Sequence, residues 1–191
     1  MTALAASGLV LVTAMAHAQG QAQGPREVDA AALFEQATQA GRVGEARRTR
    51  PVDARPAQAG EVVVTVIQGD GVETRSRPAA AGDWVARNRC PATGNEQYLI
   101  AGARFPERYG PQRGEPDAQG WREFHPTGVT MQFFTLTPAE GEITFMAPWG
   151  ERMVGRPGDV LVRDPGNLRD LYRIYSVSFG CTYEITRPPQ R

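Results

Sequence analysis

The chain has 191 residues, and 21 acidic side chains balance its 21 basic ones, all of which are arginine. This neutral balance leaves no basic field that would attract nucleic acid or an anionic membrane. The absence of lysine excludes a Schiff-base enzyme, a phosphate-binding P-loop and a Ser-Lys dyad. His17 and His125 are the two histidines, which excludes a metal site built from several of them. We therefore expect no metal, no other cofactor and no nucleic-acid partner.

Residues 1–18 have the pattern of a secretory signal peptide. The segment is uncharged and rich in Ala, Leu and Val, and it ends in Ala16-His17-Ala18, the small-x-small pattern of a cleavage site. A membrane anchor is the alternative, but a spanning helix needs about 20 apolar residues and this run is shorter. We therefore expect cleavage after Ala18, a periplasmic or secreted protein, and no membrane span in the mature chain.

Residues 19–60 are expected to form a polar tether, one short helix and a flexible linker. Asp29 can cap a helix over residues 30–37, which would end near Gly41. This helix offers few large apolar residues and would be marginal unless it packs against the rest of the protein. Residues 42–60 are rich in Arg, Pro, Ala and Gly, a composition typical of a linker without a core.

The folded body is expected to begin near Glu61 and to consist of β-strands. Residues 62–67 are a run rich in β-branched side chains, which is a strong strand signal. Further short runs separated by turn residues bring the expected number of strands to about ten. These runs are 72–77, 84–87, 97–100, 121–124, 130–135, 142–146, 160–162 and 171–177. Residues 111–120 indicate a loop between a first β unit, 61–110, and a second, 121–187.

The two units repeat the same residues. Gly82-Asp83 in the first unit returns as Gly158-Asp159 in the second. Two tyrosines return at one shared offset along the chain, Tyr98 as Tyr172 and Tyr109 as Tyr183. A repeat of this length indicates two copies of one supersecondary unit. The predicted fold is mostly β, with two pseudo-symmetric units that form one small barrel or sandwich.

The repeated Gly-Asp pair has a structural interpretation. Glycine permits a positive φ at a tight turn, and the aspartate accepts hydrogen bonds from nearby backbone amides. Gly82, Asp83, Gly158 and Asp159 are therefore predicted to be turn residues, and no catalytic residue is assigned. The alternative is an enzyme that uses carboxylates in a cleft between the units, with Asp83, Asp159, Glu142 and Glu151 as the candidates. A cleft that holds two of these carboxylates would favour the enzyme, and a filled core would favour a binding protein.

The two cysteines, Cys90 and Cys181, fall in different units. An even number of cysteines in an exported chain favours a disulfide. A bond between them would connect the two units across a long loop. A reactive thiol is the alternative, but no C-x-x-C motif and no neighbouring histidine accompanies either cysteine.

Two resemblances to known families rest on short motifs. The stretch from Arg156 to Val162, with Pro157-Gly158-Asp159, resembles the Gly-Asp box of cradle-loop and double-psi barrels. A longer set of residues resembles the small "PGD(Y/W)" repeat modules of uncharacterised bacterial and phage proteins. The set consists of Met146–Val154, Pro157-Gly158-Asp159, Tyr172-Arg173-Ile174, Phe179 and Thr182-Tyr183-Glu184. This resemblance spans about residues 60 to 186 and implies no assigned activity.

Aromatic side chains are concentrated in the second unit, where most are expected in the core. Trp149 lies in a Pro-Trp-Gly turn and is the best candidate for an exposed aromatic side chain. With Glu151 and Arg152 it is a candidate for the rim of a binding groove. We therefore expect an exported, non-catalytic module that binds an envelope protein, a peptide or a small ligand. A metal-free, cupin-like ligand barrel is a further alternative, suggested by Gly150-Glu151 and the Pro-Gly-Asp motif.

Overall fold

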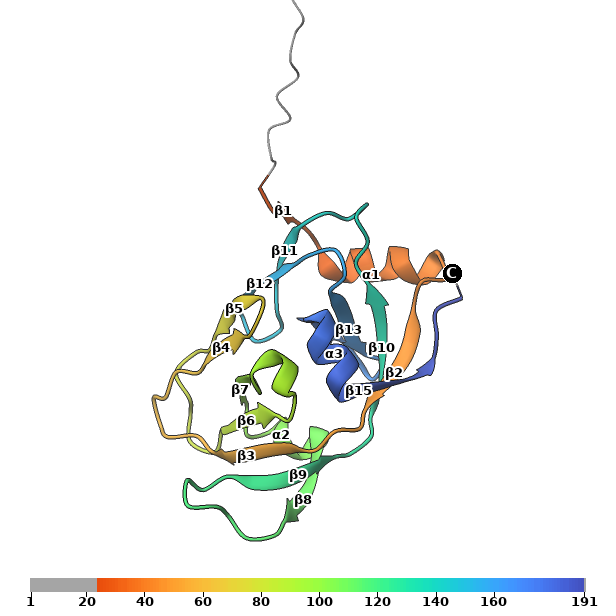
Figure 1. Cartoon of the computed structure of the whole chain (residues 1–191). Coiled ribbons are helices and arrows are strands. Elements are labelled where there is room, and N and C mark those ends of the chain that lie inside the picture. Colours follow the sequence, from red (N-terminus) through yellow and green to blue (C-terminus); the bar gives the residue numbers. More distant parts are fainter. Residues whose placement is uncertain (1–23, 191) are drawn as a thin grey trace, which may run out of the picture.

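β-strands dominate the computed structural model, which describes residues 24–190 (Figure 1). The prediction of a mostly β fold is confirmed. The predicted signal peptide and the first residues of the tether lie outside the described residues. The sheets within residues 24–190 are open and none closes into a barrel, so the fold resembles a sandwich.

Sheet I, the first of two five-stranded sheets, is antiparallel throughout. Its strands in spatial order are β14 (Asn167–Ile174), β13 (Val160–Asp164), β10 (Thr130–Thr135), β2 (Gly44–Arg48) and β15 (Tyr183–Arg187). Both faces of β10 are covered: Met131 and Phe133 belong to one core cluster, and the adjacent Phe134 belongs to another.

Sheet II, the second five-stranded sheet, is also antiparallel. Its strands in spatial order are β7 (Gln97–Ile100), β6 (Trp84–Asn88), β3 (Val52–Pro56), β9 (Arg122–Pro126) and β8 (Tyr109–Arg113). An aromatic cluster forms the core of this sheet, in which the Trp84 ring stacks on the Phe105 ring with centroids 4.5 Å apart.

The segment of residues 42–60 is not a linker. It contributes β2 to sheet I and, after a short connection, β3 to sheet II, each hydrogen-bonded on both sides. The prediction of a flexible linker is therefore wrong, as is a folded body that begins near Glu61. Small residues make the segment fit, because Ala46 and Ala54 are fully buried and a side chain at Gly44 would meet the Phe133 ring at 2.7 Å.

The two five-stranded sheets correspond strand by strand. In the order given above, β7, β6, β3, β9 and β8 of sheet II match β14, β13, β10, β2 and β15 of sheet I. The chain passes from β2 in sheet I to β3 in sheet II, and from β9 in sheet II to β10 in sheet I. Each sheet therefore contains one strand that leads directly into the other sheet, and the predicted units 61–110 and 121–187 are not separate bodies.

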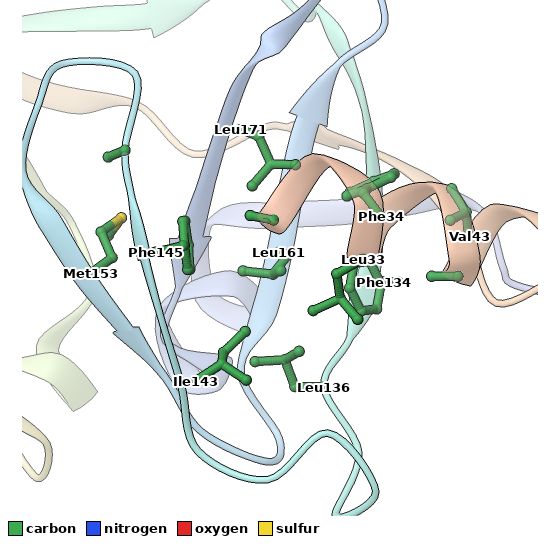
Figure 2. Close-up of a cluster of buried hydrophobic side chains, with 13 residues drawn as sticks. Leu33, Phe34, Val43, Phe134, Leu136, Ile143, Phe145, Met153, Leu161 and Leu171 are labelled. Carbon is green, nitrogen blue, oxygen red and sulfur yellow. The ribbon is translucent and has the colours of Figure 1, made fainter. Parts of the chain in front are cut away.

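Helix α1 (Ala30–Gln39) packs against sheet I (Figure 2). The Asp29 side chain caps it by accepting hydrogen bonds from the amides of Ala31 and Ala32 at 2.9 and 3.1 Å. Phe34 is fully buried, and its ring meets the Phe134 ring edge to face at a centroid distance of 5.1 Å. Tertiary packing therefore stabilises a helix that would be marginal in isolation.

Two smaller sheets complete the β structure. One consists of β1 (Arg26–Glu27), β11 (Ile143–Met146) and β12 (Arg152–Gly155), and the other is the hairpin of β4 (Val64–Ile67) and β5 (Gly71–Arg75). Contacts of β5 with β12 and of β4 with β7 place the hairpin between the three-stranded sheet and sheet II. None of the helices in residues 24–190 combines the length and the apolar character needed to cross a membrane.

The predicted disulfide between Cys90 and Cys181 is present, with the Cα atoms 5.9 Å apart. Cys90 precedes the 3-10 helix Pro91–Thr93, and Cys181 lies on helix α3 (Ser176–Thr182). The sequence predicts a strand over residues 171–177, but β14 ends at Ile174. Tyr175 is the N-cap of α3, and the helix begins at Ser176. Helix α2 (Phe105–Arg108) directly precedes β8 of sheet II, just as α3 directly precedes β15, the corresponding strand of sheet I.

Candidate ligand-binding cavity

A cavity of about 500 Å³ opens among sheet I, sheet II and the β4–β5 hairpin. Its wall contains residues of β2, β6, β7 and β14, of the hairpin strands, and of helices α2 and α3. We call it the inter-sheet cavity. Its size lies within the range of about 300–1,000 Å³ that is usual for small-molecule sites.

Five tyrosines line the inter-sheet cavity: two from each of the two five-stranded sheets, and Tyr175 at the N-terminal end of α3. Tyr98 and Tyr109 come from sheet II, and Tyr172 and Tyr183 occupy the corresponding positions of sheet I. Burial raises the pKa of Tyr98 well above its usual value, although the nearby Arg48 lowers it. Burial and then the neighbouring Tyr183 raise the pKa of Tyr172. These two phenols are therefore uncharged at neutral pH.

Arg48, at the end of β2, extends into the cavity wall among these tyrosines. Its Nη1 donates hydrogen bonds to the hydroxyls of Tyr98 and Tyr109, both at 2.9 Å, and its Nη2 donates to Asn88 Oδ1. The guanidinium lies 5.6 Å from the centroid of the Tyr183 ring. Its Nε is buried without a hydrogen-bond partner. Every polar partner of this cation in residues 24–190 is neutral.

Glu96 is a buried carboxylate on the same wall. It accepts hydrogen bonds from Asn88 Nδ2 at 2.7 Å, from the Thr93 hydroxyl and from the Ser178 hydroxyl at 2.7 Å. Asn88 therefore stands between Glu96 and Arg48, with its amide nitrogen toward the acid and its amide oxygen toward the cation. The three donors satisfy Glu96 without a salt bridge.

Asp170 follows Glu96 at the offset that relates Tyr98 to Tyr172, and it occupies the corresponding place in the other half of the wall. It accepts hydrogen bonds from Arg104 and Arg108 of the α2 region. Ser178, which contacts Glu96 from helix α3, follows Arg104 at the same offset. The two helical segments thus each contact an acidic residue of the opposite half. Arg104 and Arg108 of the α2 region form ion pairs with Asp170, whereas Ser178 of α3 donates a neutral hydrogen bond to Glu96.

Glu73 on β5 is the remaining carboxylate of the inner wall. It accepts a hydrogen bond from Arg173 Nη1 at 2.7 Å, and Arg173 also pairs with Asp70 and Asp159 at 2.7 and 2.9 Å. Burial raises the pKa of Glu73 to about 7; Arg173 opposes this shift, and the charges of Glu96 and Asp70 add to it. Three carboxylates therefore share one arginine, and Glu73 is the one that titrates near neutrality.

The three predicted binding residues fall in two places. Trp149 and Glu151 line the mouth of the inter-sheet cavity, where Trp149 Nε1 donates to Glu151 Oε2 at 2.8 Å. The Trp149 ring lies 5.6 Å from the Tyr172 ring, between centroids. Arg152 is not in the wall and instead contacts Thr144 at 3.2 Å.

The Gly-Asp pairs lie outside the cavity wall. Gly82 and Gly158 have φ angles of 89° and 98°. Asp83 accepts hydrogen bonds from the amides of Ala80 at 2.8 Å and Gly102 at 3.0 Å, and Asp159 accepts one from the Arg156 amide at 2.8 Å. Both carboxylates are buried and hold turns. Of the four carboxylates considered for an enzyme, Glu151 alone belongs to the wall.

Sequence reasoning missed Arg48, Glu73 and Glu96 as cavity residues. The repeated tyrosines are visible as a pattern, but the pattern indicates a repeat and gives no reason to expect a site. Arg48 belongs to a segment with the composition of a linker, so no pattern points to it.

Comparison with known proteins identifies no relative: no protein-family model, no curated protein and no solved structure matches the chain. The described part of the chain contains no cluster of three or more His, Cys, Asp or Glu side chains that could hold a metal ion.

Proposed function

We propose that the chain is an exported, non-catalytic module that binds a small molecule in the inter-sheet cavity. The observation that carries this proposal is the cavity itself. The space among the sheets measures about 500 Å³ and opens to solvent at a mouth, a size that is usual for small-molecule sites. Aromatic rings line it together with six arginines and four carboxylates, so the wall offers a ligand both apolar faces and charged groups. A small ligand is favoured over a peptide or an envelope protein because the recognition groups face inward.

Trp149 provides a direct test, because it lies at the mouth of the cavity. The experiment is a thermal-shift screen of the oxidised, mature protein against a library of small polar and aromatic compounds. A compound that binds the folded state raises the melting temperature, and the increase grows with its concentration relative to its Kd. Trp149→Ala is expected to weaken this response.

Trp121→Ala is the matched control, because the Trp121 ring packs against Arg55 and Arg87 and is not in the cavity wall. Its response to the compounds is expected to equal that of the wild type. If no compound raises the melting temperature, or if both variants respond alike, the proposal is refuted.

A second candidate function is an enzyme that uses Glu73 as a general acid or base. The supporting observation is the pKa of about 7 for a carboxyl in a cavity wall. The binding module is preferred because the other inner carboxylates, Glu96 and Asp170, are saturated with hydrogen bonds. Turnover of a compound found in the screen, with a rate that depends on ionisation near pH 7 and is lost in Glu73→Gln, would favour the enzyme.

The location and the ancestry are also proposals. A disulfide is typical of an oxidising compartment, which supports a periplasmic or secreted protein. A mature N-terminus directly after Ala18, measured by mass spectrometry, would test export. The matching strand order of sheets I and II supports the internal repeat, while the kinship with PGD(Y/W) modules rests on the sequence motifs. The open sheets remove the support for a cupin-like barrel.

A further inference from the structure

Six arginines line the inter-sheet cavity, against four carboxylates. Four of the six form salt bridges within residues 24–190: Arg77 with Asp83, Arg104 and Arg108 with Asp170, and Arg173 with three acids. No salt bridge among the described residues involves the other two. Arg169 is exposed to solvent at the mouth, whereas Arg48 is half-buried in the wall.

Arg48 is therefore a half-buried cation without a direct counter-charge. An arginine side chain stays protonated in proteins, so the charge cannot be removed by titration. The hydroxyls of Tyr98 and Tyr109 and the amide of Asn88 solvate it with dipoles only. A charge withdrawn from water is costly unless it is paired with an opposite charge.

Glu96 does not supply that opposite charge directly. Its two oxygens accept hydrogen bonds from Asn88, Thr93 and Ser178, and the Asn88 side chain separates it from the Arg48 guanidinium. The guanidinium has five N–H groups. Three of them donate to the two tyrosines and to Asn88, so one N–H on Nη2 and the buried N–H on Nε have no acceptor among residues 24–190.

We propose that the ligand of the inter-sheet cavity is a small organic acid whose carboxylate binds at Arg48. The carboxylate supplies the missing counter-charge and accepts a hydrogen bond from the free Nη2 N–H. This inference rests on the proposed function and adds the chemical class of the ligand.

The remainder of the ligand is a ring. Tyr183 lies beside Arg48 at 5.6 Å, measured from the guanidinium to the ring centroid, and Trp149 lies beside Tyr172 at 5.6 Å between ring centroids. All four residues line the same cavity, but Phe179 stacks on the Tyr183 ring and Arg48 lies over it, so the aromatic surface offered to the ligand is that of Trp149 and Tyr172. The hydrogen bond from Trp149 to Glu151 fixes the indole orientation at the mouth. Aromatic faces of this kind bind flat rings and the apolar faces of sugars.

The experiment compares two acids with their uncharged counterparts on the oxidised, mature wild-type protein. The acids are benzoate and D-glucuronate, and the counterparts are benzamide and D-glucose, each titrated to millimolar concentration by calorimetry and followed by Trp fluorescence. At least one acid is expected to bind more tightly than its counterpart by about 10- to 100-fold, the value of one hydrogen bond to a charged group.

Arg48→Gln removes the charge, and the acid is expected to lose the same factor in affinity while the uncharged counterpart does not. Arg47→Gln is the matched control: Arg47 is the preceding residue on β2, is exposed, and pairs with Glu184 at 3.3 Å on the surface. Arg48→Lys, which keeps the charge, replaces Arg48→Gln if that variant does not fold, and acid binding is then expected to be partly retained. Far-UV circular dichroism reports folding.

The outcomes separate the two proposals. Equal affinity for an acid and its uncharged counterpart, or acid binding that survives Arg48→Gln, overturns the role of Arg48 and leaves a cavity that binds neutral molecules. Binding of inorganic sulfate as tightly as the acids overturns the ring. Binding of neither series, while other neutral compounds from the library bind in a Trp149-dependent manner, overturns the acid alone. A response to no compound at all overturns the binding function as well.

Discussion

Glu73 offers a prediction whose sign follows from its surroundings. The pKa of its carboxyl rises from 4.5 to about 7 on folding, chiefly because of burial. Between these two pH values the folded protein keeps a proton that the unfolded chain has released. The free energy of unfolding therefore falls as the pH rises from about 4.5 to about 7, by about 3 kcal/mol in total.

The substitution Glu73→Gln removes this dependence, because glutamine is uncharged and close in shape to the protonated carboxyl. At pH 5 the variant and the wild type are expected to be about equally stable. Near pH 8 the variant is expected to be more stable by about 3 kcal/mol, or about 6–12 °C in melting temperature for a domain of this size. Urea denaturation at both pH values measures the difference directly.

Glu115→Gln is the control, since Glu115 is exposed on the loop before β9 and its removal changes the net charge equally. A difference between Glu73→Gln and wild type that stays constant from pH 5 to pH 8 would refute the reasoning. A variant that is less stable than wild type at pH 8 would show that Arg173 holds Glu73 ionised in the folded state.

Two further predictions concern the structural framework. The disulfide closes a loop with a sequence separation of 91 residues, so Cys90→Ala with Cys181→Ala is expected to destabilise the fold by about 5 kcal/mol in the chain-entropy model. Urea denaturation of the variant and of the oxidised wild type tests this, and equal midpoints would contradict it. Asp83→Ala leaves the amides of Ala80 and Gly102 without an acceptor and is expected to cost about 2–4 kcal/mol. Burial alone would raise the pKa of Asp83, but the Arg77 guanidinium and the two amides lower it below the usual value. The stability that ionised Asp83 contributes is therefore lost as the pH falls through the pKa of the folded state. An unchanged melting temperature at neutral pH with normal ligand binding would show that Asp83 is dispensable.

The strands with strong local signals could be read from the sequence. Residues 130–135 combine threonine with aromatic side chains and coincide with β10, and the apolar run of residues 160–162 is the first part of β13. The Asp29 cap with the alanine-rich stretch behind it coincides with α1. In these segments the local propensity and the tertiary environment favour the same structure.

The strands β2 and β3 could not be read in this way. Their sequences contain several arginines and a proline, and they are poor in β-branched residues. They are strands because their neighbours on both sides supply hydrogen-bonding partners, and because small residues such as Gly44 and Ala46 allow aromatic side chains to pack above them. Helix α3 is a similar case, since Gly180 and several β-branched residues disfavour a helix, but the buried Phe179 and the disulfide at Cys181 secure it.

The sequence by itself determined the mostly β class, the helix at the N-terminal side of the body, the disulfide and the pairs of related tyrosines. These follow from local propensity, from capping, from cysteine number and from repetition along the chain. Tertiary structure alone decided that β2 and β3 join opposite sheets, that a cavity remains among the sheets, and that Arg48 lies within it without an acidic partner. A charge and its counter-charge are defined by distance in space. Asn88 and Glu96 are neighbours within the β6–β7 hairpin, but Arg48 of sheet I meets Asn88 only after the two sheets have come together.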